Sequence, residues 1–230
     1  METTRFLIRQ ASLGDADAQF RAAYRLAFRR STSRHRWKEA ARLWGLAAKQ
    51  GHVRAMFFLA VCYDQGRGVA LNMPRAISWY RRAARKGHVE SAFNLGMLYR
   101  DGHGLRRDSR RAREYFRAAA MRGDIEAARE YGRILVTGRT WRQSARQGAQ
   151  WYRRAAAAGD ALAIYNLALC YLDGVGVRRS EHQAIKYLKE ASRLRVRGAG
   201  GLLRRIMTSR QKLTESRGAR SRGVGRSARS

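Results

Sequence analysis

The chain has few of the residues that interrupt helices or cross-link a fold. Its 230 residues include one proline and two cysteines, so neither a proline-rich linker nor a disulfide framework is expected. No stretch approaches the roughly 20 consecutive apolar residues of a membrane span. Near the start, arginines at positions 5 and 9 interrupt a very short apolar patch, which is not a secretory signal. We expect a cytoplasmic protein in which Cys62 and Cys170 are buried small hydrophobic residues.

Acidic residues are scarce as well. The chain has 49 Lys and Arg against 17 Asp and Glu, a formal net charge of +32, and arginine supplies almost all of it. Such an excess predicts either contact with a nucleic acid or another polyanion, or a solvated cationic surface.

Patterns that carry catalysis or bind metals are missing too. None of the five histidines stands with cysteines at zinc spacing. The Gly102-x-Gly104 sequence lacks the preceding strand and the G-K-[ST] ending of a phosphate loop. The Asp and Glu residues are spread along the chain, and no two of them form a pair that points to acid–base catalysis. We therefore expect no enzymatic activity, no cofactor and no metal site.

What the chain does contain is a repeat. Glycines at positions 51, 87, 123 and 159 recur every 36 residues. Each opens two short amphipathic patterns of helical period, which in most copies are separated by a glycine turn such as Gly102 and Gly104. The second pattern carries a recurring bulky pair: Trp79-Tyr80, Tyr115-Phe116, Trp151-Tyr152 and Tyr187-Leu188. Repeats of this period predict a solenoid of helix pairs.

The strings Y-x-x-G-x-G-V and A-x-x-W-Y-R-x-A-A-x-x-G resemble the Sel1-like repeat, a relative of the tetratricopeptide repeat. The resemblance is strongest from Ala55 to Gly87 and from Ala163 to Ala191, and it covers Gly14 to Leu194. It implies an all-α fold, an α/α superhelical solenoid of antiparallel helix pairs. It also implies an adaptor or scaffold for other proteins, without indicating one partner.

The repeat fixes the predicted domain organisation: a lead-in at 1–13, repeats at 14–50, 51–86, 87–122, 123–158 and 159–194, a capping helix within 195–214, and a disordered Arg/Ser/Gly tail at 215–230. Leu202, Leu203, Ile206 and Met207 fall on one side of the capping helix. A membrane-surface helix is the alternative, but the end of a solenoid needs a cap. Gly148 lies within a predicted helix, where it should cost about 1 kcal/mol relative to alanine.

Charge is segregated by helix. In repeats two to five the first-helix halves carry a net charge of −2 and the second-helix halves +17. First helices line the concave surface of tetratricopeptide superhelices, so the resemblance implies a groove that is not basic and a positive outer surface. That outer surface should present Arg81, Arg82, Arg110, Arg111, Arg153, Arg154, Arg178 and Arg179.

One stripe of the first helices supplies the predicted groove. Its candidate partner-binding residues are Arg54, Phe58, Glu90, Asn94, Met97, Glu126, Glu130, Arg133, Asn166 and Asp173. Val61 and Leu169 either belong to this stripe or pack between repeats. Asn94 and Asn166 either clamp a peptide backbone or are ordinary surface amides.

Two functions fit these patterns. The first is a non-enzymatic, monomeric scaffold that binds a segment of another protein in the groove. Charge reversal at Glu126 and Glu130 should then lower the affinity for that partner. The alternative is a nucleic-acid-binding protein that uses the arginine-rich outer face and the tail.

Overall fold

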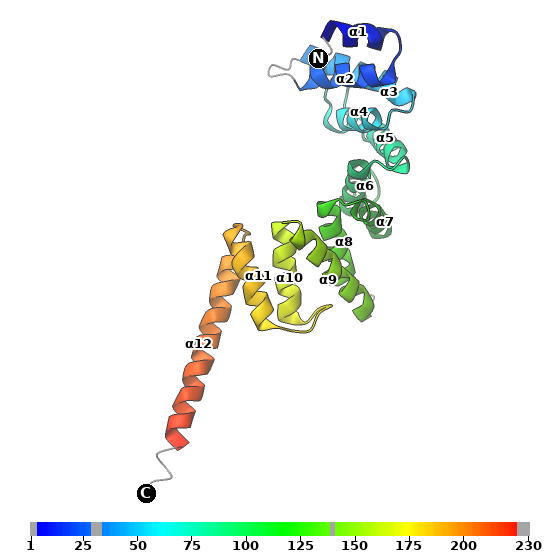
Figure 1. Ribbon diagram of the computed structural model, residues 1–230. Helices are drawn as coiled ribbons and strands as arrows, with labels where there is room; N and C mark the ends of the chain where they lie inside the picture. The colour runs from blue at the N-terminus through cyan, green and yellow to red at the C-terminus, as the bar shows by residue number, and fades with distance from the viewer. Residues whose placement is uncertain (1–3, 29–33, 139–140, 225–230) are drawn as a thin grey trace. The chain divides into compact units, whose positions relative to one another are not determined.

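The computed structural model describes residues 4–28, 34–138 and 141–224, and all regular structure in these ranges is helical (Figure 1). The helices are α1 (Thr4–Ser12), α2 (Ala16–Ala27), α3 (Arg34–Lys49), α4 (Val53–Gln65), α5 (Met73–Arg85), α6 (Val89–Asp101), α7 (Ser109–Ala120), α8 (Ile125–Thr137), α9 (Trp141–Ala157), α10 (Ala161–Asp173), α11 (Glu181–Arg193) and α12 (Ala199–Val224). From α1 to α7 and from α9 to α12, consecutive helices pack on one another, as the predicted solenoid of helix pairs requires.

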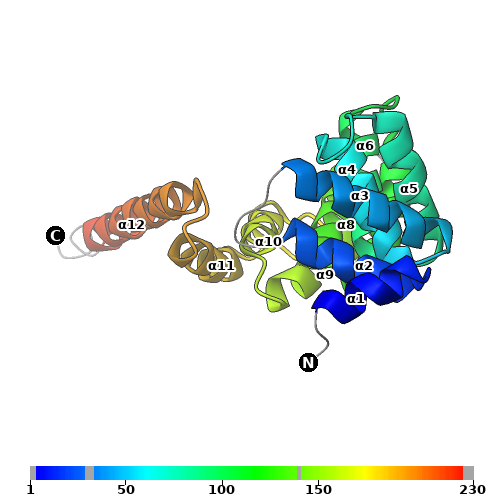
Figure 2. The ribbon, with the colours of Figure 1, turned by 90° about the horizontal axis from the view of Figure 1, so that it is seen from above.

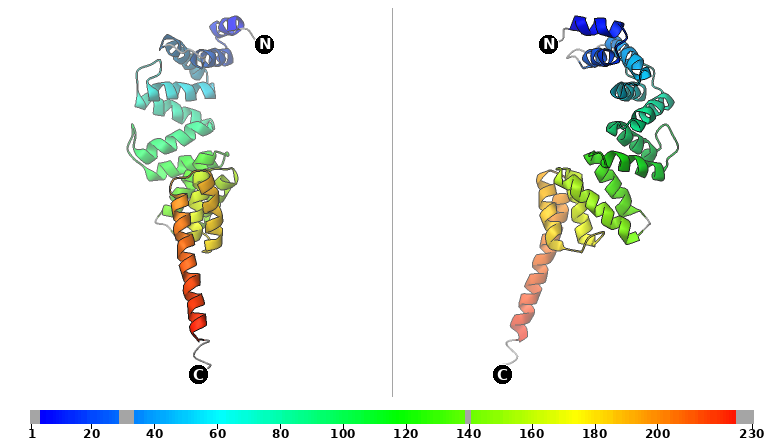
Figure 3. Two further views of the ribbon diagram at one scale, coloured as in Figure 1. Left: turned by 90° about the vertical axis from the view of Figure 1, so that its left-hand side faces the viewer. Right: turned by 45° about the vertical axis from the view of Figure 1, so that its right-hand side comes forward.

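The chain divides into two compact units, which are described separately below. The N-terminal unit comprises residues 1–127 and holds α1 to α7 with the first turn of α8. The C-terminal unit comprises residues 128–230 and holds the rest of α8 and α9 to α12. Within the N-terminal unit, the pairs α2–α3, α4–α5 and α6–α7 follow one another (Figure 3).

Short polar side chains and glycines set the helix ends. The second helices α5, α7 and α11 begin at Asn72, Asp108 and Ser180, whose side chains each accept a hydrogen bond from a backbone N–H three residues on. The glycines that separate the repeats all have positive φ, between 88° and 95°, which only glycine adopts without strain: Gly51, Gly87, Gly123 and Gly159. The 36-residue period is therefore a period of helix caps.

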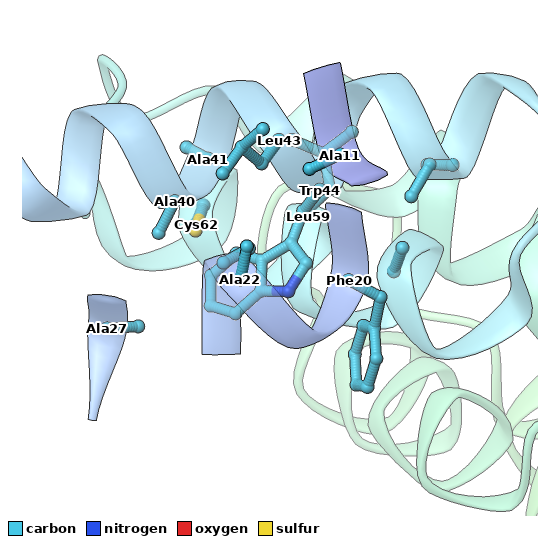
Figure 4. Close-up of a cluster of buried hydrophobic side chains, with 14 of the residues drawn as sticks. Ala11, Phe20, Ala22, Ala27, Ala40, Ala41, Leu43, Trp44, Leu59 and Cys62 are labelled. Carbon is cyan, nitrogen blue, oxygen red and sulfur yellow. The ribbon is translucent and has the colours of Figure 1, made fainter. Parts of the chain in front are cut away.

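The core of the N-terminal unit forms where α2, α3 and α4 meet (Figure 4). Trp44 of α3 is fully buried and stacks on Phe58 of α4, with 4.9 Å between ring centroids. Phe20 of α2 lies 5.9 Å from the same Phe58 ring. The predicted lead-in at residues 1–13 contains α1, in which Leu7 and Ala11 are buried. The divergent first copy thus contributes its aromatic residues to one shared core.

In the C-terminal unit, α8 and α9 approach closely at two glycines. A Cβ atom at Gly148 would lie 2.8 Å from the carbonyl oxygen of Gly132 and 2.7 Å from a methyl group of Val136. The prediction that Gly148 is merely a weak helix former is therefore incomplete. Its missing side chain is what allows the two helices to touch.

The last helix, α12, packs on α11 at its start and then runs beyond it (Figures 1 and 2). Leu202, Leu203 and Ile206 contact the core formed by α10 and α11, as expected of a cap, whereas Met207 is 45% exposed. The helix continues to Val224, so the disorder predicted from residue 215 is wrong for residues 215–224. The segment lacks proline, and its many arginines favour helix. A helix whose start is packed on α11 can therefore continue through it. Residues 225–230 lie outside the described ranges.

Candidate interaction surfaces

The first-helix surface of the N-terminal unit is carried by α4 and α6. Arg54 is exposed, and its guanidinium lies 4.9 Å from the centroid of the Phe20 ring. Phe58, predicted to face a partner, instead lies among Phe20, Trp44 and Phe57. Phe20 and Trp44 belong to α2 and α3, so the half-buried Phe58 ring packs against the core and leaves only part of its surface to a partner.

On α6, three predicted residues keep a partly accessible position. Glu90 is exposed, while Asn94 and Met97 are half-buried. The Asn94 side chain hydrogen-bonds the hydroxyl of Tyr80, which also donates to Asp64 at 3.2 Å. Burial raises the pKa of Tyr80, so this hydroxyl stays protonated. Asn94 therefore already holds one polar partner within the unit.

The first helices α4 and α6 are capped by histidine. The Nδ1 atoms of His52 and His88 accept from backbone N–H groups at 3.1 Å and 3.3 Å. The His88 ring stacks on Phe57, with centroids 4.8 Å apart. Burial lowers the pKa of His88 below its ordinary value; Glu90 opposes this effect and Arg54 adds to it. The neutral, hydrogen-bond-accepting form is thus favoured.

In the C-terminal unit, Glu130 is only 5% exposed and lies in an ion-pair network. Its carboxylate accepts from Arg129 at 2.9 Å and from Arg133 at 3.1 Å. Arg129 also donates at 3.1 Å to Asp160, the N-cap of α10. Glu130 therefore pairs with two arginines of its own helix, and reversing its charge would place a cation beside both of them. The predicted use of Glu130 as a groove contact is corrected accordingly.

The remaining groove candidates lie near helix ends or on an open face. Glu126, in the first turn of α8, is exposed and belongs to the N-terminal unit. On α10, Asn166 is half-buried, Asp173 is exposed at the last turn, and Leu162 is 48% exposed. The two open alternatives, Val61 and Leu169, are both half-buried, and Val61 packs against the core of α5 and α6.

The predicted basic residues are held in different ways. Arg82 and Arg154 occupy equivalent repeat positions and lie over Trp79 and Trp151, at 4.8 Å and 4.6 Å from the ring centroids. Arg110 is paired with Glu114 at 3.2 Å on the exposed face of α7. The other members, Arg178 and Arg179, are exposed in the turn before α11.

Three further predicted arginines are bound to tyrosine hydroxyls. Arg81 and Arg111 both donate to the hydroxyl of Tyr99, at 2.7 Å and 3.1 Å, and Arg153 donates to that of Tyr171 at 3.2 Å. The tyrosines were not predicted as site residues. The signal was present in the sequence, because Arg81 and Tyr99 recur 72 residues later as Arg153 and Tyr171.

Sequence reasoning also missed a cavity of about 770 Å³ in the N-terminal unit, bounded by α1, α2 and α3. Its walls include Leu7, Leu26, Phe28, Leu43 and Leu46. Within the described ranges, no three His, Cys, Asp or Glu side chains gather as metal ligands would. In those same ranges, no helix is both long and apolar enough to cross a membrane.

These features define a helical-repeat protein of the solenoid class. The family model of the Sel1 repeat matches residues 53–88, 89–124, 125–160 and 161–195, more than half of the chain. The chain therefore belongs to the Sel1 repeat family, whose members generally act as scaffolds for protein–protein interactions. The family model does not extend over the predicted first copy at 14–50, where the structure has the helix pair α2–α3.

Solved structures of this fold are similar over most of the chain. A Sel1 repeat protein from Oxalobacter formigenes is 26% identical, with a TM-score of 0.73, covering 88% of this chain and 58% of that one. A protective antigen of uropathogenic Escherichia coli with an SLR fold is 24% identical, with a TM-score of 0.68, covering 88% and 51%. This chain thus spans only part of the length of both. A search of the curated proteins finds no match.

Proposed function

We propose that this chain is a non-enzymatic scaffold that binds a segment of another protein on the surface of its first helices. The observation that carries the proposal is the match of four consecutive Sel1 repeats, because the family's members generally act as scaffolds for protein–protein interactions. The two free, buried thiols, Cys62 and Cys170, fit the reducing cytoplasm as its compartment.

Within that surface, α6 is the best candidate for contact. Glu90, Asn94 and Met97 follow one another at spacings of four and three residues, so they share one face of the helix. Together they offer a carboxylate, an amide and a polarizable apolar side chain, a mixture that suits an extended peptide or a helix. Arg54 of α4 and Glu126 of α8 extend the set with exposed charges of both signs.

Site-specific photo-crosslinking tests this assignment in the cells that make the protein. A photoreactive amino acid at Met97 should capture one protein reproducibly, whereas the same group at Arg113, exposed on α7, should not. Capture of the same protein from both positions, or from Arg113 alone, would move the binding surface away from the first helices. Mass spectrometry of the Met97 adduct names the partner.

Nucleic-acid binding is retained as a second proposal because the second helices and turns expose arginines such as Arg82, Arg110 and Arg178. Affinity for duplex DNA should then fall with salt, with a log–log slope of about −0.9 per phosphate neutralised. The contribution of the tail is tested by ending the chain after Lys212, which keeps Leu202, Leu203 and Ile206 packed on the α10–α11 core. A slope near zero in the full chain would exclude this proposal.

A further inference from the structure

Two arginine-lined cavities occupy equivalent places in different repeats. The first, of about 480 Å³ in the N-terminal unit, is lined by Arg81, Tyr99, Leu105, Arg106, Arg107 and Arg111. The second, of about 1240 Å³ in the C-terminal unit, is lined by Arg146, Arg153, Tyr171, Val177 and Arg178 among others. Four positions of the first cavity, 81, 99, 105 and 106, recur in the second exactly two repeats later. The repeat has thus built the same kind of cavity twice.

Each cavity holds an arginine against a tyrosine hydroxyl. In the first, the Tyr99 oxygen accepts from Arg81 at 2.7 Å and from Arg111 at 3.1 Å. In the second, Tyr171 accepts from Arg153 at 3.2 Å. Both tyrosines are themselves fixed by stacking, on Tyr115 and Tyr187, each with centroids 5.7 Å apart and planes 10° apart. The guanidinium groups are therefore oriented by a rigid support.

This support does not neutralise the arginines. A tyrosine hydroxyl is uncharged, so it accepts a hydrogen bond while leaving the positive charge uncompensated. The one carboxylate lining the first cavity, Asp108, caps α7 by accepting from the Arg111 N–H at 2.9 Å and lies 3.5 Å from the Arg111 guanidinium. The equivalent residue two repeats later is Ser180, and among the residues that the structure describes no carboxylate lines the second cavity.

The remaining arginines of the cavities are available to a ligand. Among the described residues, Arg106, Arg107, Arg146 and Arg178 are exposed and form no ion pair or side-chain hydrogen bond. Like charges that line one cavity repel one another, and an anion placed between them reduces that repulsion. The planar guanidinium donates two parallel hydrogen bonds to the oxygens of one tetrahedral or planar oxyanion.

We propose that each cavity binds a phosphate-class oxyanion, which the tyrosine-oriented arginines hold. The free cationic neighbours, Arg106 and Arg107 in one cavity and Arg178 and Arg146 in the other, close around it. The inference is independent of the proposed protein-binding surface, because none of the first-helix candidates lines either cavity.

Titration calorimetry of the full-length chain with pyrophosphate, at ionic strength fixed with sodium chloride, tests the proposal. The decisive variant is Tyr99→Phe with Tyr171→Phe, which keeps the rings and the net charge but removes both hydroxyl acceptors. Affinity should fall about five- to tenfold, the effect of losing one hydrogen bond of ordinary net strength. The control is Arg110→Gln with Arg113→Gln, which removes two exposed charges of α7 that do not line the cavity. It should change affinity less than twofold.

A second arm identifies the source of the phosphate. Single-stranded oligothymidylate replaces pyrophosphate, and the same variants are compared. Weaker binding of both probes by the tyrosine variant assigns the cavities to backbone phosphates, and weaker binding of pyrophosphate alone assigns them to a small phosphorylated ligand. Wild-type affinity of the tyrosine variant for both probes, with a folded circular dichroism spectrum, overturns the proposal. So does an equal loss in the arginine control, because binding would then follow net charge alone.

Discussion

At the scale of single residues, one position of the repeat contacts the neighbouring copy through a different interaction in each of two copies. In one copy Phe57 stacks on His88, the cap of the next first helix; in a later copy Arg129, at the equivalent position, pairs with Asp160, again the next cap. The residue at this repeat position therefore contacts the N-cap of the next first helix in both copies, by aromatic stacking in one and by an ion pair in the other.

The histidine cap makes stability depend on pH. The pKa of His88 is lowered in the folded chain relative to about 6.5 when unfolded. Stability from this group is therefore fully present above about pH 6.5 and is lost as pH falls toward the folded pKa, because the unfolded chain binds the proton first. Urea denaturation at pH 7.5 and 5.5 measures how much free energy of unfolding is lost on acidification. This loss should be smaller in the variant His88→Asp than in the wild-type chain, since Asp124 and Asp160 occupy the equivalent position in other repeats. An equal loss in both proteins would contradict the assignment.

Because of the buried ion-pair network, Arg129 should contribute more to the free energy of unfolding than Arg133 does. Arg129→Ala should cost about 3 kcal/mol, because it removes a partner from two carboxylates that are mostly buried. Arg133 is 41% exposed in its side chain and, among the described residues, forms an ion pair with Glu130 alone, so Arg133→Ala should cost under about 1 kcal/mol. Equilibrium denaturation compares the two variants, and equal costs would show that the network contributes no more than a surface pair.

At the scale of helices, the contact between α8 and α9 depends on glycine. Gly148→Ala should destabilise the chain by about 1–2 kcal/mol, because crowding against Gly132 and Val136 outweighs the gain in helix propensity. The matched control is Ala112→Gly, at the equivalent position of α7, where the buried methyl group is lost. A more stable Gly148→Ala variant would show that α8 and α9 do not pack as closely as described.

Caps and core faces of these helices could be predicted because they depend on residues within one 36-residue period. Asn72, Asp108 and the glycines with positive φ act on their own helix ends, so local pattern suffices. The burial of Glu130 could not be predicted, because the network around it includes Asp160 from the next repeat. The packing of Phe58 against the core could not be predicted for a similar reason: its neighbours Phe20 and Trp44 belong to the divergent first copy, where the repeat pattern gives no register.

At the scale of the whole molecule, the two cysteines lie in different units, Cys62 in the N-terminal and Cys170 in the C-terminal one, so each thiol reports on the unfolding of its own unit. Burial raises the pKa of the Cys62 thiol to about 12 and that of Cys170 to about 11, so neither thiolate forms at neutral pH. In native protein both should resist a thiol reagent, and both should react over one urea range, because α8 runs through the boundary between the units. Single-cysteine variants, Cys62→Ala and Cys170→Ala, measure each thiol separately. Two distinct transitions would show that the units unfold independently.

The scaffold proposal is tested most directly by affinity capture of the tagged full-length chain from its own cells, with and without nuclease, at moderate salt. The account predicts one protein retained in both lanes, and its loss from the variant Glu90→Lys with Glu126→Lys, but not from Arg110→Glu with Arg113→Glu. These substitutions lie on the first-helix surface and on the exposed face of α7, respectively. Recovery that collapses with nuclease would contradict the account, because the partners would then be tethered through RNA or DNA and the arginines would be the functional surface.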